Sequence, residues 1–159
     1  MGCDERNWRG KPADSRHSER DHRHSQVAQA MTDIWEEVWE MINATFQRIA
    51  TSLAVTHPTM CWSSGHNDND AFPFRGYAAF KKSSADEEVV ASVDFHKQDD
   101  ELRFSADIGL DDGRILADGP VGVIKIAAGL ATARADIDAA VKDIVRFLEA
   151  NEPVIRSAM

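Results

Sequence analysis

Residues 74–118 alternate between apolar and polar side chains with a period of two. The alternation is clearest in two stretches, residues 89–96 and residues 102–110, which a short polar segment separates. A period of two is typical of a strand with one buried and one exposed face. The pattern therefore predicts two antiparallel strands joined as a hairpin.

The register of this hairpin follows from the position of its turn. With Gln98-Asp99 as the two turn residues, Phe95 lies opposite Leu102 and all apolar residues share one face. On the other face Asp94 then lies opposite Arg103, which is a favourable cross-strand pair. We predict that the apolar face is buried and that the charged face is exposed.

Two flanking strands extend this sheet. Residues 74–81 alternate in the same way, and the loop after them sets Arg75 opposite Asp94. Downstream, Asp112-Gly113 is a strong hairpin signal, because a tight turn there needs positive φ angles that glycine adopts without strain. Gly119-Pro120 is expected to end the last of these strands.

An amphipathic helix is predicted before the sheet, from Asp33 to Val55. Thr32 or Asp33 can serve as its N-cap, and Glu36 completes a capping box. Apolar residues recur at spacings of three and four, and we expect this stripe to be core rather than a ligand platform. The stripe consists of Trp35, Val38, Trp39, Ile42, Phe46, Ile49 and Leu53.

A second amphipathic helix is predicted after the sheet, from Thr132 to Ala150. Asn151 and Pro153 are expected to end it, and residues 154–159 are expected to be a frayed tail. Its apolar stripe consists of Ile137, Val141, Ile144, Val145 and Leu148.

These elements predict an α+β fold, a four- to five-stranded antiparallel meander with an N-terminal and a C-terminal helix packed on one face. Residues 121–126 form either the fifth strand or a buried connection. Residues 31–153 are predicted to be a single domain. Residues 1–30 are rich in charge and poor in apolar side chains, so we expect a disordered extension. Met31 is an alternative start of the protein, because the first helix follows it directly.

Charge and cysteine content narrow the functional classes. The chain carries 27 acidic and 18 basic residues and lacks a basic stripe, so we expect neither nucleic acid nor a membrane surface as its partner. Cys3 and Cys61 provide no disulfide framework, which indicates a reducing compartment, the cytoplasm. No apolar run reaches the roughly 18 residues of a membrane span, and the first 30 residues contain no secretory signal.

Residues 57–70 contain three side chains that could bind a metal or act in catalysis, His57, Cys61 and His66. Their spacing matches no established metal motif. We therefore expect a short edge strand at residues 60–62 followed by a polar loop, with no metal and no cofactor. A metal or nucleophile site formed by these three residues is the alternative.

The exposed face of the predicted sheet carries the candidate binding residues. Arg75 and Arg103 both lie opposite Asp94 in the predicted register, and an ordinary solvated sheet face would show the same pairing. A binding face and a solvated face therefore both remain open. The candidate binding residues are Arg75, Tyr77, Asp94, His96 and Arg103.

The sequence predicts a small, acidic, non-catalytic protein-binding module of the cytoplasm. It would present its sheet face or edge to a partner protein or to a second copy in a homodimer. The helix–meander–helix layout resembles secretion-chaperone and toxin-immunity proteins in architecture alone, with no shared motif. The alternative is a small enzyme or a metal- or ligand-binding protein that uses residues 57–70, although the sequence has neither a Gly-rich phosphate loop nor a nucleophile elbow.

Overall fold

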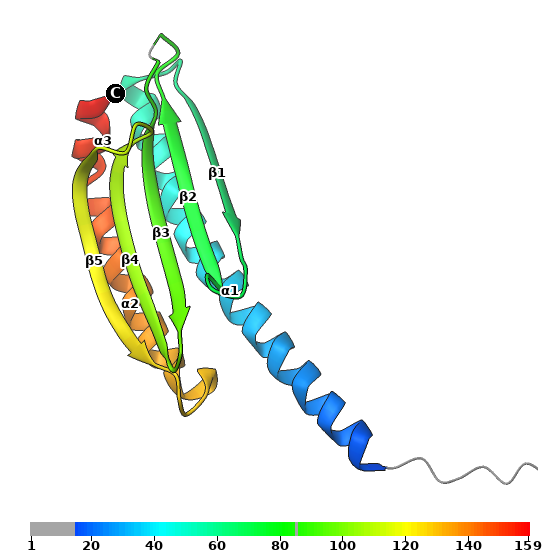
Figure 1. Ribbon diagram of the computed structural model, residues 1–159. Coiled ribbons are helices and arrows are strands. Elements are labelled where there is room, and N and C mark those ends of the chain that lie inside the picture. The colour runs from blue at the N-terminus through cyan, green and yellow to red at the C-terminus, as the bar shows by residue number, and fades with distance from the viewer. Residues whose placement is uncertain (1–14, 85) are drawn as a thin grey trace, which may run out of the picture. The chain divides into compact units, whose positions relative to one another are not determined.

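The computed structural model describes residues 15–84 and 86–159, with side chains described from Ile34 onward. The predicted α+β fold is confirmed (Figure 1). The expected disorder of residues 1–14 falls outside the described residues. The elements follow in the order α1 (Ser15–Thr56), β1 (Cys61–Asn67), β2 (Phe74–Lys81), β3 (Val89–Gln98), β4 (Glu101–Leu110), β5 (Ile115–Lys125), α2 (Leu130–Ala150) and α3 (Glu152–Ala158).

In the described residues the strands form one antiparallel sheet of five strands, in the order β1-β2-β3-β4-β5. Every strand pairs with its neighbours in the sequence, so the predicted meander is confirmed (Figure 1). Of the two possibilities for residues 121–126, the fifth strand is correct, because β5 extends to Lys125.

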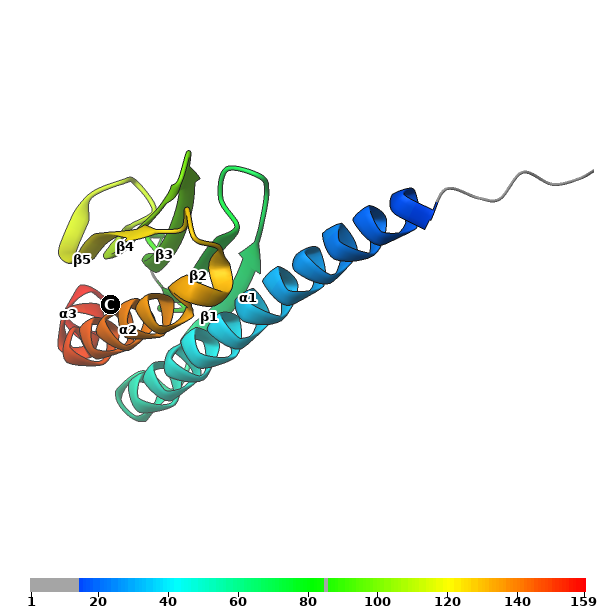
Figure 2. The same ribbon diagram turned by 90° about the horizontal axis from the view of Figure 1, so that it is seen from below.

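Residues 33–159 form a compact unit in which the helices lie on one face of the sheet (Figure 2). Alternate residues of β2 and β3 are buried, which is the predicted period of two. Both predicted helix stripes face this core, with Trp35 and Trp39 partly buried at its margin. The buried stripe residues are Val38, Ile42, Phe46, Ile49 and Leu53 of α1 and Ile137, Val141, Ile144 and Leu148 of α2.

Polar contacts join α1 to the C-terminal helices. The Arg48 guanidinium donates a 2.8 Å hydrogen bond to Glu149 of α2. The Ser52 hydroxyl donates a 3.0 Å hydrogen bond to Glu152 of α3. These contacts connect residues that lie 100 or 101 positions apart in the sequence, so they join the first helix to the last two within the helix layer.

The register between β2 and β3 is the predicted one. Arg75 pairs with Asp94, and Phe80 pairs with Val89. The Arg75 Nε donates a hydrogen bond of 3.0 Å to the Asp94 carboxylate, so the cross-strand ion pair also forms.

The predicted register between β3 and β4 is wrong by two residues. The turn residues are Asp99 and Asp100, and Phe95 therefore lies opposite Phe104. A shift of two keeps every side chain on its own face, so alternation alone does not detect it. Asp99 has a φ angle of 53°, a left-handed conformation that aspartate tolerates better than most residues. One further pair, Gln98 with Glu101, joins the ladder.

The same shift changes the neighbours of two candidate binding residues. Asp94 lies opposite Ser105 rather than opposite Arg103, and Arg103 lies opposite His96. The predicted pair between Arg103 and Asp94 is therefore wrong, while the pair between Arg75 and Asp94 is confirmed.

The prediction that Gly119-Pro120 ends a strand is also wrong, because β5 continues through it. The register of β4 and β5 shifts between Ser105 and Asp107, so Gly119 and Pro120 together oppose Ala106 in a β-bulge. Proline is tolerated there because β5 is an edge strand. Glycine is required at the close approach, since a Cβ on Gly119 would lie 2.3 Å from the backbone oxygen of Ala106.

Helix α1 begins at Ser15 rather than at Asp33, so residues 15–30 are helical where disorder was expected. The sequence contains neither proline nor glycine between Pro12 and Pro58. Extending an existing helix costs much less than nucleating a new one, which explains why a polar segment continues the helix.

Residues 154–159 do not form the expected frayed tail. Asn151 ends α2, and Pro153 occupies the first turn of a new short helix, α3. Proline suits that position, because the first turn of a helix leaves its N–H groups without partners in any case. Ile155 of α3 has a relative exposure of 0% and belongs to the hydrophobic core.

Candidate functional site

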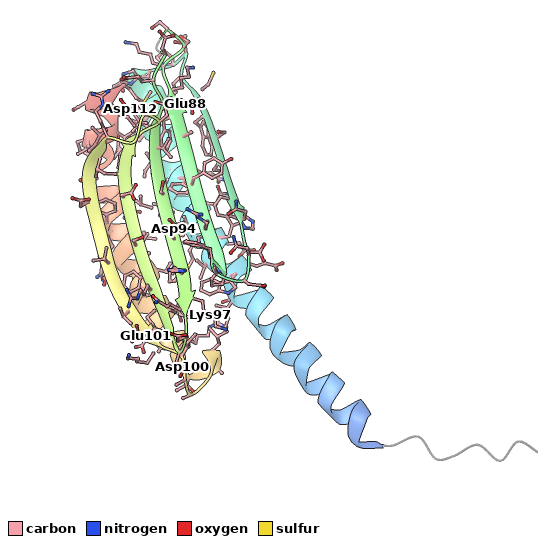
Figure 3. The ribbon with its side chains drawn as sticks, in the orientation of Figure 1. Glu88, Asp94, Lys97, Asp100, Glu101 and Asp112 are labelled. Carbon is pink, nitrogen blue, oxygen red and sulfur yellow. The ribbon has the colours of Figure 1, made fainter. Side chains whose placement is uncertain are left out.

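The sheet face opposite the helices, which we call the outer face, is not covered by any element of residues 33–84 or 86–159 (Figure 1). Directly paired residues of an antiparallel sheet point to the same side, so the register defines the rows of this face. Its two central rows are Gly65, Tyr77, Ser92, Asp107 and Asp118, and Asn67, Arg75, Asp94, Ser105 and Val121. Figure 3 shows Asp94 near the middle of the sheet, between charged groups at either end.

The outer face contains a shallow hollow of about 180 Å³ over β1, β2 and β3. Three of the predicted binding residues, Arg75, Tyr77 and Asp94, line it. The structure adds residues that the sequence did not single out, and the complete lining is Asn67, Arg75, Gly76, Tyr77, Ser92 and Asp94.

Arg75 is held in place from two sides. Its Nε donates to Asp94, and its guanidinium carbon lies 4.2 Å from the ring centroid of Phe72. A cation over an aromatic face is attracted by the ring quadrupole. Nearly half of the Arg75 side chain stays exposed, so an ordered guanidinium remains available to a partner.

Phe72 comes from the loop between β1 and β2, which is itself well anchored. The Asn69 side-chain oxygen accepts hydrogen bonds from the backbone N–H groups of Ala71 and Phe72. The backbone N–H of Lys97 in β3 donates a 2.7 Å bond to the Ala71 carbonyl. On its other side the Phe72 ring stacks on His96 at 4.6 Å. His96, a predicted binding residue, therefore supports the loop and does not line the hollow.

Arg103 lies outside the hollow. It makes a 3.5 Å ion pair with Glu101, which precedes it by two residues on the same face of β4. Glu101 also binds Lys125, and the hydrogen bond from Lys125 is the main reason why its pKa lies below the ordinary glutamate value. The structure therefore places Arg103 in a charged group at one end of the outer face.

The Tyr77 ring fits against the neighbouring strand because the residue opposite it is a glycine. It lies opposite Gly65 of β1, and a Cβ on that glycine would lie 3.0 Å from the Tyr77 oxygen. The Tyr77 ring therefore approaches the backbone of β1 while 46% of the residue stays exposed. An exposed aromatic ring held against the sheet is well suited to contact a partner.

Three carboxylates lie close together next to the hollow. Asp107 pairs directly with Asp118 of β5 and is a close neighbour of Asp94. Burial, followed by the charges of Asp94 and Asp118, raises the pKa of Asp107 above the ordinary aspartate value. This side of the outer face therefore carries negative charge that its own cations do not fully balance.

The edge strand expected at residues 60–62 is present but longer, because β1 occupies Cys61–Asn67 where a polar loop was expected after residue 62. Cys61 pairs with Lys81 on the outer face, whereas His66 pairs with Gly76 on the helix side, where its ring centroid lies 4.6 Å from that of the tilted Trp39 ring. The two side chains thus point to opposite faces and are five residues apart, roughly 17 Å along a strand.

His57 lies in the turn after α1, where its Nδ1 is 3.0 Å from the Thr56 hydroxyl. The structure therefore does not bring the alternative site residues, His57, Cys61 and His66, together. Across the described part of the chain, no three histidine, cysteine, aspartate or glutamate side chains are arranged so that they could hold a metal ion.

The sequence did not single out Asn67 and Ser92, for different reasons. Asn67 belongs to the segment that was expected to be a loop, so it had no assigned face. Ser92 already lay opposite Tyr77 in the predicted register of β2 and β3, and that register is confirmed. Ser92 could therefore have been predicted as a hollow residue from its position opposite Tyr77, whereas Asn67 could not.

Among the described residues, no helix has the length and apolar character that a membrane crossing requires. No family model matches the chain, and comparisons with curated proteins and with solved structures give no match either.

Proposed function

We propose that this chain is a non-catalytic protein-binding module of the cytoplasm, chaperone-like or immunity-like in its role. Its interface would be the outer face around Tyr77 and Arg75, presented to a partner protein or to a second copy. The observation that carries the proposal is an uncovered sheet face with an exposed tyrosine beside an exposed, already ordered arginine.

The residue types support a protein partner. Tyrosine and arginine are enriched among the residues that dominate the binding energy of interfaces. Arg75 is already oriented by Asp94 and Phe72, so binding would cost less side-chain entropy.

The shape of the hollow supports the same choice. Its volume of about 180 Å³ is below the roughly 300–1,000 Å³ that is usual for small-molecule pockets. Among the described residues Cys61 has no disulfide partner, and its exposed thiol agrees with a reducing compartment. The net charge of −9 favours a partner with basic groups.

The alternative, an enzyme or metal-binding protein that uses residues 57–70, receives less support. Cys61 and His66 point to opposite faces of the sheet, so they do not form a nucleophile and base pair within hydrogen-bond reach.

The proposal can be tested by site-specific photo-crosslinking in cells. A photoreactive residue at position 77 is expected to capture one defined protein, whereas the same residue at the exposed position 142 of α2 is not. The captured protein is then purified, and its affinity is measured by calorimetry for the wild type and for Tyr77→Ala. We expect about thirtyfold weaker binding for this variant, the loss typical of an interface hot spot.

Lys81→Ala is the matched control, because Lys81 lies on the same strand and the same face but outside the hollow. Its affinity should stay close to that of the wild type. Equal capture from positions 77 and 142, or unchanged affinity for Tyr77→Ala, would contradict the proposal.

A further inference from the structure

Strand β5 forms one edge of the sheet (Figure 1), and its outer face carries exposed apolar side chains. Val121 is 76% exposed and Val123 is 51% exposed. An exposed edge strand with apolar side chains is a template for pairing with another strand. The hollow around Tyr77 is lined by residues of β1, β2 and β3, so it includes none of these β5 side chains.

The backbone of β5 offers regularly spaced hydrogen-bonding groups to this edge. The N–H of Ile126 bonds to the Asp100 carbonyl at 2.9 Å, so it points toward β4. Orientation alternates along a strand, and the even-numbered residues 122 and 124 therefore also turn their N–H and C=O groups toward β4. The groups of Val121, Val123 and Lys125 consequently face the open edge.

The backbone N–H and C=O groups of Asp118, on the other side of the bulge, also face the open edge. The N–H of Asp111 bonds to the Glu88 carbonyl, so the odd-numbered residues of β4 bond to β3. Asp107 is one of these residues, and its partner Asp118 must turn its backbone groups toward the open edge. From Asp118 to the end of β5, four residues thus present both their side chains on the outer face and their backbone groups at the edge, namely Asp118, Val121, Val123 and Lys125. Ile115, at the start of β5, pairs with Gly109 and follows the same rule.

The charge pattern of Asp118, Val121, Val123 and Lys125 is complementary to the same pattern on a second, antiparallel strand. Read along the chain they are negative, apolar, apolar and positive, so an antiparallel copy meets each charge with its opposite and each valine with a valine. Asp118 makes no ion pair with any other described residue and lies beside Asp107. Lys125 contacts Glu101 and keeps 75% of its side chain exposed.

We propose that two copies of this chain pair through antiparallel β5 strands around a two-fold axis at Gly122. Asp118 then lies opposite Lys125 of the second copy, and Val121 lies opposite Val123 of the second copy. The two sheets become one continuous sheet of ten strands. The interface is isologous, because the same strand serves on both sides.

Local features of β5 fit this register. Gly119 and Pro120 share one position of the ladder in the bulge, so the missing N–H of Pro120 removes no bond from the new pairing. Lys125 of the second copy brings a positive charge to the neighbouring carboxylates of Asp118 and Asp107. The valine pairs bury apolar surface that is exposed in the single chain.

A charge-exchange experiment tests both the partner and the register. The wild-type chain and the variants Asp118→Lys and Lys125→Asp are compared by sedimentation velocity over a dilution series, with reductant present. We expect the wild type to dimerise and each variant to dimerise about tenfold more weakly, because each homodimer then carries two like-charge pairs. An equimolar mixture of the two variants restores the opposite-charge pairs at both positions, so it should dimerise as tightly as the wild type.

Val123→Pro is a second, independent test. Its N–H points to the open edge, so proline removes a bond of the proposed dimer without removing one from the pairing with β4. This variant should be monomeric while its circular dichroism spectrum and urea midpoint stay close to those of the dissociated wild type. Arg75→Ala, in the hollow, should leave the dimer intact, which separates this interface from the one proposed around Tyr77 and Arg75.

A wild-type chain that stays monomeric over the whole series overturns the proposal. So does a dimer that both charge variants leave unchanged, since it must use another surface. A mixture of the two variants that associates no better than each variant alone refutes the register.

Discussion

Replacing Ile155 by alanine tests whether the short C-terminal helix α3 belongs to the core. The side chain of Ile155 has a relative exposure of 0% and packs in the hydrophobic cluster with the sheet and the other helices. A frayed tail at this position would make the substitution almost neutral. The two possibilities therefore differ in the free energy of unfolding.

The expected magnitude follows from the atoms removed. Ile155→Ala deletes three carbon atoms from a fully buried site, which at ~0.8 kcal/mol for each buried carbon group amounts to about 2.4 kcal/mol. The cavity that remains adds to this cost, because the surrounding side chains collapse only in part. We expect a total loss of about 3 kcal/mol, within the range of roughly 2–5 kcal/mol for such substitutions.

Urea denaturation followed by tryptophan fluorescence measures this loss. The midpoint should fall while the slope with urea concentration stays the same, because the surface exposed on unfolding does not change. Ser157→Ala is the matched control in the same helix, because Ser157 is exposed and its substitution should shift the midpoint very little. A loss below about 1 kcal/mol for Ile155→Ala would refute the assignment of α3 to the core.

Two further predictions concern the sheet. Asp107→Asn should raise the free energy of unfolding at neutral pH, because the raised pKa of Asp107 means that the fold disfavours its charged form. The gain should vanish below the ordinary aspartate pKa of about 3.8, where Asp107 is protonated in both the folded and the unfolded state. Urea midpoints of the wild type and the variant at neutral and acid pH measure this, and a gain that persists at acid pH would contradict the prediction. Gly119→Ala should cost about 1–3 kcal/mol because its Cβ would collide with a backbone oxygen. Gly122→Ala should cost less, because it meets the tip of a phenylalanine ring that can move, and equal losses in urea denaturation would contradict this reasoning.

The sheet was largely predictable from alternation, whereas cross-strand charge supported the correct register between β2 and β3 but a wrong one between β3 and β4, where Arg103 was placed opposite Asp94. The β2 and β3 pairing was correct since Arg75 with Asp94 supported it in addition to the apolar pattern. The β3 and β4 pairing was displaced by two residues, because such a shift leaves every side chain on its own face. The choice between the turns Gln98-Asp99 and Asp99-Asp100 depends on the backbone conformation of Asp99, which the pattern does not encode.

Elsewhere tertiary context overrode local signals. Gly119-Pro120 is a strong breaker in isolation, but at a bulge on an edge strand it is accommodated. The end of the preceding helix at Asn151 and Pro153 was predicted correctly, but the frayed tail expected after it was wrong, because Pro153 also lies in the first turn of α3. In both places proline alone did not specify the type of element on its far side.

The candidate site was predictable only in part. The exposed sheet face and three residues of its hollow, Arg75, Tyr77 and Asp94, followed from alternation. Asn67 did not, because the seven residues of β1 have a weak apolar pattern and are recognised as a strand only by their pairing with β2.

The meander order has a consequence for how the chain reaches its folded state. Each strand pairs with the strand beside it in the sequence, so every sheet contact closes a short loop and costs little chain entropy. The side-chain hydrogen bonds of longest sequence separation join α1 to the C-terminal helices, as between Arg48 and Glu149. The sheet can therefore form from neighbouring strands first, and joining α1 to the C-terminal helices closes the longest loop of residues 33–159.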